Sequence, residues 1–520
     1  MNLIFLVCAF LLAGFEVDAL SYDYSASIEC LTQPLKPQYN GGIIRNPDLN
    51  NGLEGWNSFG DAKIEHRESS GNKYVVAHSR KHAHDSVSQK ISIEKGKHYT
   101  LSAWIQVSTG NVLVTAIVKT SKEYNFAGAI FAESKCWSML KGGFTAQDSG
   151  PAELYFEGNN TSVEKWIDNV SLQPFTDKEW SSHQDQSTEQ NRKRKVLIQA
   201  QDEQGKPLAN AKILFQMKKA SFPFGSSMNK YILNNALYQN WFASRFTVTA
   251  FENEMKWYST ESVQGKEDYT TADAMLQFAK NHNIDVRGHN VFWDDPSFQP
   301  GWVPSLSPTQ LTSATEQRFK SVVSKYKGKV IAWDVVNENL HFSFYESKLG
   351  PNFSSKIFEE VHNVDAGTTL FLNEYNTIED NRDSVASPAS RYGTPTQIIL
   401  RVQYFELGLK ELHSHPMVKG IVMWTALSPQ GCYRICLTDN NFKNLPAGKV
   451  VDRFLAQWKP KNLSGVTDKN GYLELSLFHG DYEMKISHSV KNNSSFSQLL
   501  NVSPQNQSNT IKQFVKLSVK

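Results

Sequence analysis

The feature that most constrains this fold is an alternation of strand-like and helix-like segments between Phe222 and about Trp458. Strands that alternate with helices form parallel sheets, because each helix carries the chain back across the sheet. The candidate strands are Phe222–Ser226, Phe246–Ala250, Asp285–Gly288, Val330–Val336, Thr369–Leu372 and Gly420–Trp424. We therefore predict that residues 221–460 form an α/β barrel of the TIM (β/α)₈ type, in which functional side chains lie at the C-terminal ends of the strands.

The remaining length predicts further domains, because 520 residues correspond to about three domains of ordinary size. Residues 40–175 contain short alternating strands without helical stretches, which is typical of a jelly-roll-like β-sandwich. The polar segment 176–195 predicts a linker. The segments 196–217 and 463–520 resemble two halves of a carboxypeptidase-regulatory-like sandwich, so we expect the barrel to be inserted into one small β-sandwich made from both flanks.

Residues 1–19 have the pattern of a signal peptide. An apolar run from Leu3 to Leu12 is followed by Val17-Asp18-Ala19, a small-residue cleavage pattern. No later run reaches the roughly 18 apolar residues that a membrane-spanning helix needs. We therefore expect a secreted protein. Asn-x-Ser/Thr sites, which fit a secreted glycoprotein, occur at Asn159, Asn160, Asn169, Asn352, Asn462, Asn493, Asn501 and Asn506.

Four cysteines follow the predicted leader, and an even number in an exported protein indicates two disulfides. Cys432 and Cys436 would close one short loop, and Cys30 and Cys136 would tie the N-terminal segment to the first domain. A zinc site is the competing interpretation, but neither pair has a His or Cys at the usual ligand spacing. We therefore expect no metal and no organic cofactor.

The segment Trp333-Asp334-Val335-Val336-Asn337-Glu338-Asn339 combines a buried-strand pattern with an amide and a carboxylate at its end. It resembles the acid/base motif of family 10 xylanases. The resemblance implies that Glu338 is the general acid/base and that Asn337 binds the sugar near the scissile bond. A glycosidase needs a carboxyl group with a raised pKa beside the leaving oxygen, and a strand end lined by aromatic residues can desolvate it.

Three further segments resemble strand motifs of the same family in the same order: 252–257, 287–293 and 420–425. The first implies that Glu252, Asn253 and Lys256 bind substrate hydroxyls. The second implies that His289 is a hydrogen-bond partner and Trp293 a sugar platform. The third implies that Trp424 stacks on the sugar at the cleavage subsite.

The first domain resembles a family 22 carbohydrate-binding module, through Gly41-Gly42-Ile43-Ile44-Arg45-Asn46-Pro47, Leu154-Tyr155-Phe156-Glu157 and Trp166-Ile167-Asp168-Asn169-Val170. Such modules bind xylan in a cleft on one sheet face, and Glu157 is the candidate polar contact. Tyr155 and Trp104 are candidates for stacking on sugar rings, with core packing as the alternative for each.

The family pattern breaks after the fifth-strand motif, Phe371-Leu372-Asn373-Glu374-Tyr375-Asn376. The family nucleophile is a Glu in a strand-seven motif such as Thr-Glu-Leu-Asp, and this segment of the chain contains neither that motif nor the strand-six Gln/Glu-Ser/Gly-His motif. Only 43 residues, 377–419, precede the last strand, whereas two further βα units need about 75–90. Apolar residues at helical spacing from Ile398 to Leu412 predict the helix before that strand. We therefore expect a barrel that lacks about two strands and the nucleophile, with Glu374 as a weak substitute.

Three hypotheses follow for the function. The resemblance implies an endo-1,4-β-xylanase, a retaining glycoside hydrolase that acts on cell-wall xylan, with activity impaired by the missing nucleophile. The alternatives are a non-catalytic xylan-binding cell-wall protein and a truncated gene product. A net charge of only +2 favours neither a nucleic acid nor a membrane surface as partner, so xylan, a neutral polysaccharide, is the expected one.

Overall fold

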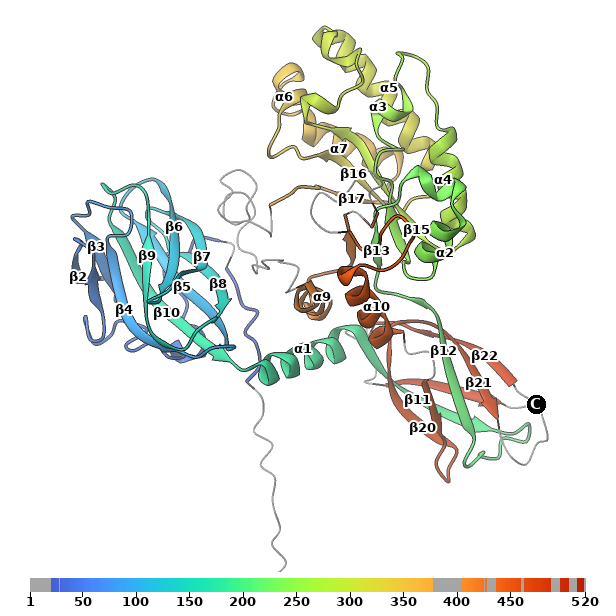
Figure 1. The fold of residues 1–520 in the computed structure, drawn as a ribbon, viewed down its shortest axis with the longest axis horizontal. Helices are drawn as coiled ribbons and strands as arrows, with labels where there is room; N and C mark the ends of the chain where they lie inside the picture. Colours follow the sequence, from blue (N-terminus) through green and yellow to red (C-terminus); the bar gives the residue numbers. More distant parts are fainter. Residues whose placement is uncertain are drawn as a thin grey trace, which may run out of the picture.

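The computed structural model describes residues 20–27, 29–376, 405–424, 426–427, 436–459, 463–487, 496–504 and 512–518. These residues form a β-sandwich, a connecting helix, a curled parallel sheet with helices, and a small C-terminal sandwich (Figure 1). The fold is therefore multidomain, with the β-sandwich and the α/β barrel-type sheet that the sequence predicts.

The first domain is a sandwich of two five-stranded antiparallel sheets. One sheet has the order β1-β4-β9-β6-β7 and the other β2-β3-β10-β5-β8. The strands are β1 (Asn57–Phe59), β2 (Lys63–Ser69), β3 (Asn72–His78), β4 (Ser86–Ile93), β5 (His98–Val107), β6 (Asn111–Lys119), β7 (Tyr124–Glu133), β8 (Ser138–Thr145), β9 (Gly150–Glu157) and β10 (Lys165–Phe175). Alternating apolar residues such as Leu154 and Phe156 fill the space between the sheets.

All six strands predicted for the barrel form one parallel sheet, in the order β17-β16-β15-β14-β13-β18. They are β13 (Phe224–Ser226), β14 (Val248–Ala250), β15 (Asp285–Trp293), β16 (Ala332–Asn337), β17 (Thr369–Phe371) and β18 (Ile421–Met423). Within the described residues, β17 and β18 each pair on one side only. Residues 377–404, which lie between them in sequence, are outside the described part of the chain, and the predicted loss of two strands stays a prediction.

Helices connect and cover these strands (Figure 1). They are α2 (Ala236–Ala243), α3 (Trp257–Thr260), α4 (Thr270–Asn281), α5 (Pro308–Tyr326), α6 (Phe344–Leu349), α7 (Phe353–Val364), α9 (Phe405–Ser414) and α10 (Pro446–Trp458). The described part of the helix predicted over 398–412 is therefore helical, while its first turns fall outside the described residues. Buried aromatic residues such as Trp333 and Tyr345 form the core between sheet and helices.

The small sandwich takes strands from both sides of the barrel, as predicted. Its strands are β11 (Lys193–Gln201), β12 (Lys212–Ala220), β19 (Leu463–Val466), β20 (Tyr472–Phe478), β21 (Gly480–Ser487), β22 (Phe496–Val502) and β23 (Lys512–Ser518). β11 pairs with β20 and β23, and β12 pairs with β19 and β21. Each of the two sheets therefore combines a strand that precedes the barrel in sequence with strands that follow it.

The segment predicted as a linker forms helix α1 (Asp177–Arg192) over most of its length, which the sequence analysis did not predict. Thr176 and Glu179 make a capping box at its start, which satisfies free backbone N–H groups. Polar side chains dock it: Gln184 Nε2 donates to Glu411 (3.0 Å), and Arg192 Nε donates to the His413 carbonyl (2.7 Å). A search for apolar periodicity does not detect a helix that is held by polar contacts.

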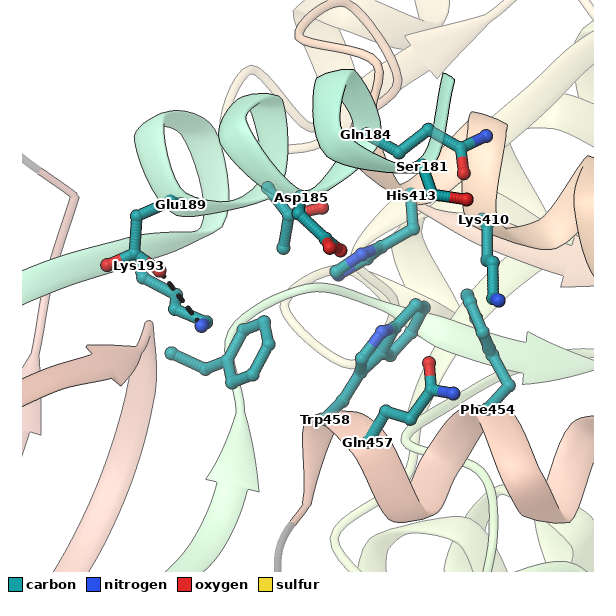
Figure 2. A pocket seen from close by; sticks show the side chains of 12 residues that line it. Ser181, Gln184, Asp185, Glu189, Lys193, Lys410, His413, Phe454, Gln457 and Trp458 are labelled. Atoms are coloured by element: carbon teal, nitrogen blue, oxygen red, sulfur yellow. Dashed lines mark hydrogen bonds and ion pairs between the residues drawn. The ribbon is translucent and has the colours of Figure 1, made fainter. Parts of the chain in front are cut away.

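A cavity of about 470 Å³ lies between α1, α9, α10 and the small sandwich (Figure 2). His413 stacks on Trp458 at one side of it, with ring centroids 3.5 Å apart, and Glu189 pairs with Lys193 (2.9 Å) at another. The His413 ring also contacts Phe222, just before β13. The cavity therefore lies near the N-terminal ends of the strands, whereas the predicted functional side chains follow the C-terminal ends.

Cys30 and Cys136 form the predicted disulfide, with Cα atoms 5.3 Å apart. Cys436 is also disulfide-bonded, and Cys432 lies outside the described residues. Across the described ranges, no helix is both long and apolar enough to cross a bilayer.

Replacing Phe215 tests whether the small sandwich is one cooperative unit. Phe215 is fully buried in the core that both flanks share. Phe215→Ala should lower the stability of this sandwich by about 3–5 kcal/mol, because it leaves a cavity. Hydrogen exchange should accelerate together in β11, β12, β20 and β21, with β5 and β10 unchanged. Acceleration on one side of the barrel alone would contradict the shared core.

Candidate active site and sugar-binding face

The C-terminal ends of neighbouring strands carry the predicted site residues of the barrel. Glu252 follows β14, Trp293 ends β15, Glu338 follows β16 and Trp424 follows β18. Parallel strands bring their C-terminal ends to the same edge of a sheet, where barrel enzymes bind substrates. Hydrogen bonds and ring contacts connect five of the predicted site residues directly: Trp293, Glu338, Lys256, His289 and Trp424.

Glu338 has a left-handed backbone conformation, with φ of 60°. This conformation is strained for a residue with a side chain and persists where neighbouring contacts fix it. The Glu338 N–H donates to the Asn373 carbonyl (2.9 Å), and the Trp293 indole N–H donates to the Glu338 carboxylate (2.9 Å). Burial raises the pKa of Glu338 against the lowering effect of the Trp293 hydrogen bond, and the negative charge of Glu374 adds to the rise. A raised pKa favours the protonated carboxyl group, which is the form that a general acid requires.

The buried carboxylate of Asp334 orients two side chains of β15. Arg287 Nε donates to it (2.9 Å), and His289 Nδ1 lies 2.7 Å from its other oxygen. Burial lowers the pKa of His289, which favours the neutral ring. Because a carboxylate only accepts, the proton sits on Nδ1, and Nε2 is the acceptor side of the imidazole. His289 can therefore accept a hydrogen bond from a sugar hydroxyl.

Lys256 lies between the two tryptophans of the site. Its ammonium nitrogen is 4.1 Å from the centroid of the Trp293 ring and 5.7 Å from that of Trp424. Burial lowers the pKa of Lys256 to about 8, while Glu338 and Glu252 oppose this shift. Phe298 stacks on Trp293 with centroids 4.0 Å apart, whereas Trp424 is 54% exposed. Trp424 thus offers the more open aromatic surface for a sugar ring.

Glu252 and Asn253 have separate partners. Ser227 Oγ and Asn229 Nδ2 donate to the Glu252 carboxylate, at 3.2 and 3.3 Å, and burial raises its pKa. Asn253 is exposed, and its Oδ1 accepts from the Tyr258 hydroxyl (2.6 Å). Glu338 is not among these hydrogen-bond partners.

The carboxylate of Glu374 is held by the loop that follows β16. It accepts from the Leu340 N–H (2.9 Å) and the Tyr375 N–H (3.0 Å), and His341 Nδ1 lies 2.8 Å away. Only 1% of the Glu374 side chain is exposed. A carboxylate engaged in this way fixes the loop beside Glu338 and is poorly placed to attack a sugar carbon.

The predicted sugar-binding residue Glu157 lies on the outer side of the sheet that contains β1 and β9. Its carboxylate accepts from the Tyr155 hydroxyl (2.7 Å), and the Tyr155 ring stacks on Phe59 with centroids 4.0 Å apart. Lys119 lies 5.4 Å from the centroid of Phe59. Tyr155 is only 1% exposed because of this packing, so Phe59 belongs to the same surface cluster as Glu157.

Trp104 lies elsewhere and is 1% exposed. It packs with Tyr74, Trp137 and Met139 in a separate cluster of the other sheet. The expectation that Trp104 could stack on a sugar is therefore wrong, because its ring has no accessible face.

Several side chains that complete these sites were not singled out from the sequence. Asn373 Nδ2 donates to Asn337 Oδ1 (2.7 Å), and Arg287 donates to Asn373 Oδ1 (3.0 Å). Arg287 and Asn373 lie inside the motifs of the third and fifth strands, which is the signal that could have identified them. His341 and Phe59 lie outside every motif, and only the tertiary structure brings them to the sites.

Comparisons with known proteins match these two regions to families. Residues 214–390 match the family described as "Glycosyl hydrolase family 10", and residues 41–162 match "Carbohydrate binding domain". A solved structure of the CBM22-1-GH10 modules of endo-1,4-beta-D-xylanase 10B from Clostridium thermocellum, complexed with xylohexaose, covers 78% of this chain and 96% of that chain. Its sequence identity is 16% and its TM-score 0.38.

Two relatives from Arabidopsis thaliana match almost the whole chain. "Endo-1,4-beta-xylanase 5-like" is 33% identical over 548 residues, which cover 94% of this chain and 93% of the relative. "Endo-1,4-beta-xylanase 5" is 32% identical over 562 residues, which cover 96% and 95%. With this match over nearly its full length, the chain belongs to glycosyl hydrolase family 10 and carries an N-terminal carbohydrate-binding domain.

Proposed function

We propose that this chain is a secreted xylan-binding protein of the cell wall, in which the hydrolytic chemistry of family 10 is impaired by the loss of the nucleophile. The observation that carries the proposal is the state of Glu374. This candidate second carboxylate is buried and bound by His341 and the Leu340 N–H, so Glu338 has no partner carboxylate among the described residues that contact it.

Glu338 is the proposed general acid/base. Its pKa is raised by burial, and the Trp293 hydrogen bond and the Asn373 carbonyl fix its position. In retaining glycosidases, this residue protonates the leaving oxygen while a second carboxylate, about 5–5.5 Å away, attacks the anomeric carbon. The acid alone cannot complete the double displacement.

The sequence supports the missing nucleophile. Residues 377–419 contain no Thr-Glu-x-Asp segment and are too few for two further βα units. The alignment with the first Arabidopsis relative extends over 548 residues, more than the 520 of this chain. That relative therefore carries residues that have no counterpart here.

Binding is supported by two groups of residues. The first domain, proposed to be of family 22 type, presents Glu157, Phe59 and Lys119 on one sheet face. In the barrel, Trp424, His289 and Lys256 form a group of aromatic and hydrogen-bonding side chains that suits a pyranose ring. The two Arabidopsis relatives are named as endo-1,4-beta-xylanases, and we propose 1,4-linked xylan as the ligand of this chain too.

Replacing Glu157 tests the binding face in the full-length protein. Glu157→Ala should weaken binding to soluble xylan roughly tenfold, because a half-buried hydrogen-bonding carboxylate on the binding face is lost. Affinity electrophoresis or calorimetry measures the change. Glu68→Ala, on exposed β2 of the other sheet, is the matched control and should bind normally. Equal losses in both variants would contradict this face assignment.

The rate of xylan hydrolysis tests whether the catalytic activity is impaired. The purified protein should release reducing ends at least roughly 10⁴-fold more slowly than an intact family 10 enzyme, and Glu338→Ala should leave this residual rate unchanged. Robust turnover that disappears in Glu338→Ala would overturn the proposal.

Turnover with azide, a small external nucleophile, distinguishes a cleft that lacks only its nucleophile from a cleft that has collapsed. With an aryl β-xylobioside whose leaving group needs no acid, azide can attack the anomeric carbon directly, displace the aryl oxide and give an α-xylobiosyl azide. The proposal expects this product, and Trp424→Ala should reduce its rate. Azide-independent turnover with a β-configured product would instead reveal a working second carboxylate.

A further inference from the structure

Residues 20–27 cross from the carbohydrate-binding domain to the barrel without forming a helix or strand. Tyr22 within this segment is nonetheless buried, with 8% exposure. A segment near the start of a chain stays ordered only where contacts tie it down. Its partners lie on four elements: the 3-10 helix η1 (Gln38–Gly41) and β8 of the first domain, helix α1, and the turn after α9 of the barrel.

Contacts with the first domain come from Gln38 and Tyr39 in η1, which bond to Ser25 and Asp23, and from Lys141 in β8. Its ammonium group donates to the carbonyls of Asp23 and Ser25 and lies 5.0 Å from the centroid of the Tyr22 ring. The Cys30–Cys136 disulfide fixes the chain just beyond the segment near the start of the same strand. Residues 20–27 are therefore anchored firmly to the carbohydrate-binding domain.

Contacts with α1 and the barrel are aromatic. The Tyr22 ring meets Trp180 of α1 edge-on, with centroids 5.4 Å apart, and the Tyr24 ring meets His415 edge-on at 5.0 Å. His183 of α1 lies beside both tyrosines, at 5.4 Å from each ring. The segment thus closes the joint between the two domains.

A chain of hydrogen bonds through His183 fixes which ring nitrogen carries the proton. The Tyr22 backbone N–H donates to Nδ1 (3.4 Å), so Nδ1 is an acceptor and Nε2 carries the hydrogen. Nε2 then donates to the Tyr24 hydroxyl (2.9 Å), which donates to Ser187 Oγ (3.4 Å). Ser187 in turn donates to the Ser414 carbonyl of the barrel (2.6 Å). The chain is complete only with neutral His183, because a second proton would place an N–H at Nδ1 against the Tyr22 N–H.

We propose that residues 20–27 are a strap that docks on β8, α1 and His415, holds the carbohydrate-binding domain against the barrel, and is released when His183 gains a second proton. The strap makes the sugar-binding face and the barrel site one rigid unit near neutral pH. In acid, the binding domain moves on helix α1 independently of the barrel. This inference does not depend on whether the chain hydrolyses xylan.

The electrostatic surroundings of His183 favour its neutral form in the docked state, as the proposal requires. Burial, together with the charge of the nearby His415, lowers the pKa of His183 to about 4. The titratable groups that contact His183 or shift its pKa are Tyr22 and Tyr24 of the strap and His415 of the barrel. In the next layer, Arg192 and Lys141 act on His415, and Glu411 acts on Tyr22 and Tyr24. The docked pKa lies below the ordinary histidine value of about 6.5, so the released state binds more protons. Docking is therefore fully stable above about pH 6.5 and weakens as the pH falls toward 4.

Hydrogen exchange of α1 amides and the radius of gyration from small-angle scattering test the strap in the full-length protein. Between pH 7 and pH 5, the opening of α1, corrected for intrinsic exchange rates, should increase roughly twentyfold, and the radius of gyration should rise. At pH 7, Tyr22→Ser/Tyr24→Ser should already show this open state. Tyr24→Phe, which keeps the ring and loses the hydroxyl link, should open α1 roughly fivefold more often.

Two further variants complete the test. His183→Asn should remove most of the pH dependence, whereas His66→Asn, in β2 with a contact only inside the first domain, should keep it. Tyr231→Ser, an exposed barrel tyrosine, is the control for tyrosine loss. If the hydrogen exchange of α1 and the radius of gyration are unchanged in both Tyr22→Ser/Tyr24→Ser and Tyr24→Phe, the proposed docking of the strap is wrong. Unchanged pH dependence in His183→Asn would overturn the proton switch.

Discussion

The hydrogen bonds around Glu374 connect the two halves of the candidate active site. Its carboxylate accepts from the Leu340 N–H and lies 2.8 Å from His341, while the adjacent Asn373 carbonyl accepts from the Glu338 N–H. These bonds hold Glu338 in its left-handed conformation with its carboxylate on Trp293. The same bonds occupy the acid that could have replaced a nucleophile. Under the proposed function, this one set of contacts both positions Glu338 as the proton donor and keeps Glu374 from acting as a substitute nucleophile.

Elements defined by regular apolar patterns could be predicted from the sequence. The six barrel strands are short buried runs that follow helical segments, and all six occur in one parallel sheet. The shared small sandwich could be predicted because each flank carries a turn followed by an alternating strand. Strand ends were predicted less accurately: β13 begins at Phe224, two residues later than predicted, and β15 continues to Trp293, five residues beyond its predicted end.

Features held by polar or aromatic contacts could not be predicted in this way. Helix α1 buries His183, Gln184 and Ser187, residues that composition assigns to a linker. Trp104 lies in a sheet with apolar residues on both faces, so the sequence does not show that its ring is covered. Phe59 covers Tyr155 from a different strand, and His341 reaches Glu374 across 33 residues of sequence. Motifs identify residue types at strand ends, but their partners come from the tertiary structure.

Polar burial also explains how the domains are joined. Lys141, His183 and Arg192 each donate to or accept from the backbone of another part of the chain. Such contacts form only when the partner is in place, because an unpaired buried polar group is costly. A joint of this kind is specific in geometry and sensitive to protonation, in contrast to the apolar cores within each domain.

The central claim, that no carboxylate attacks the sugar opposite Glu338, can be tested with an activated 2-deoxy-2-fluoro-xylobioside. This reagent forms a long-lived covalent bond with the nucleophile of a retaining glycosidase, because the fluorine slows the second displacement. Peptide mass spectrometry after incubation should show no glycosylated Asp or Glu in this protein, under conditions that fully label an intact family 10 xylanase. A stoichiometric adduct on any carboxylate, including Glu374, would contradict the account.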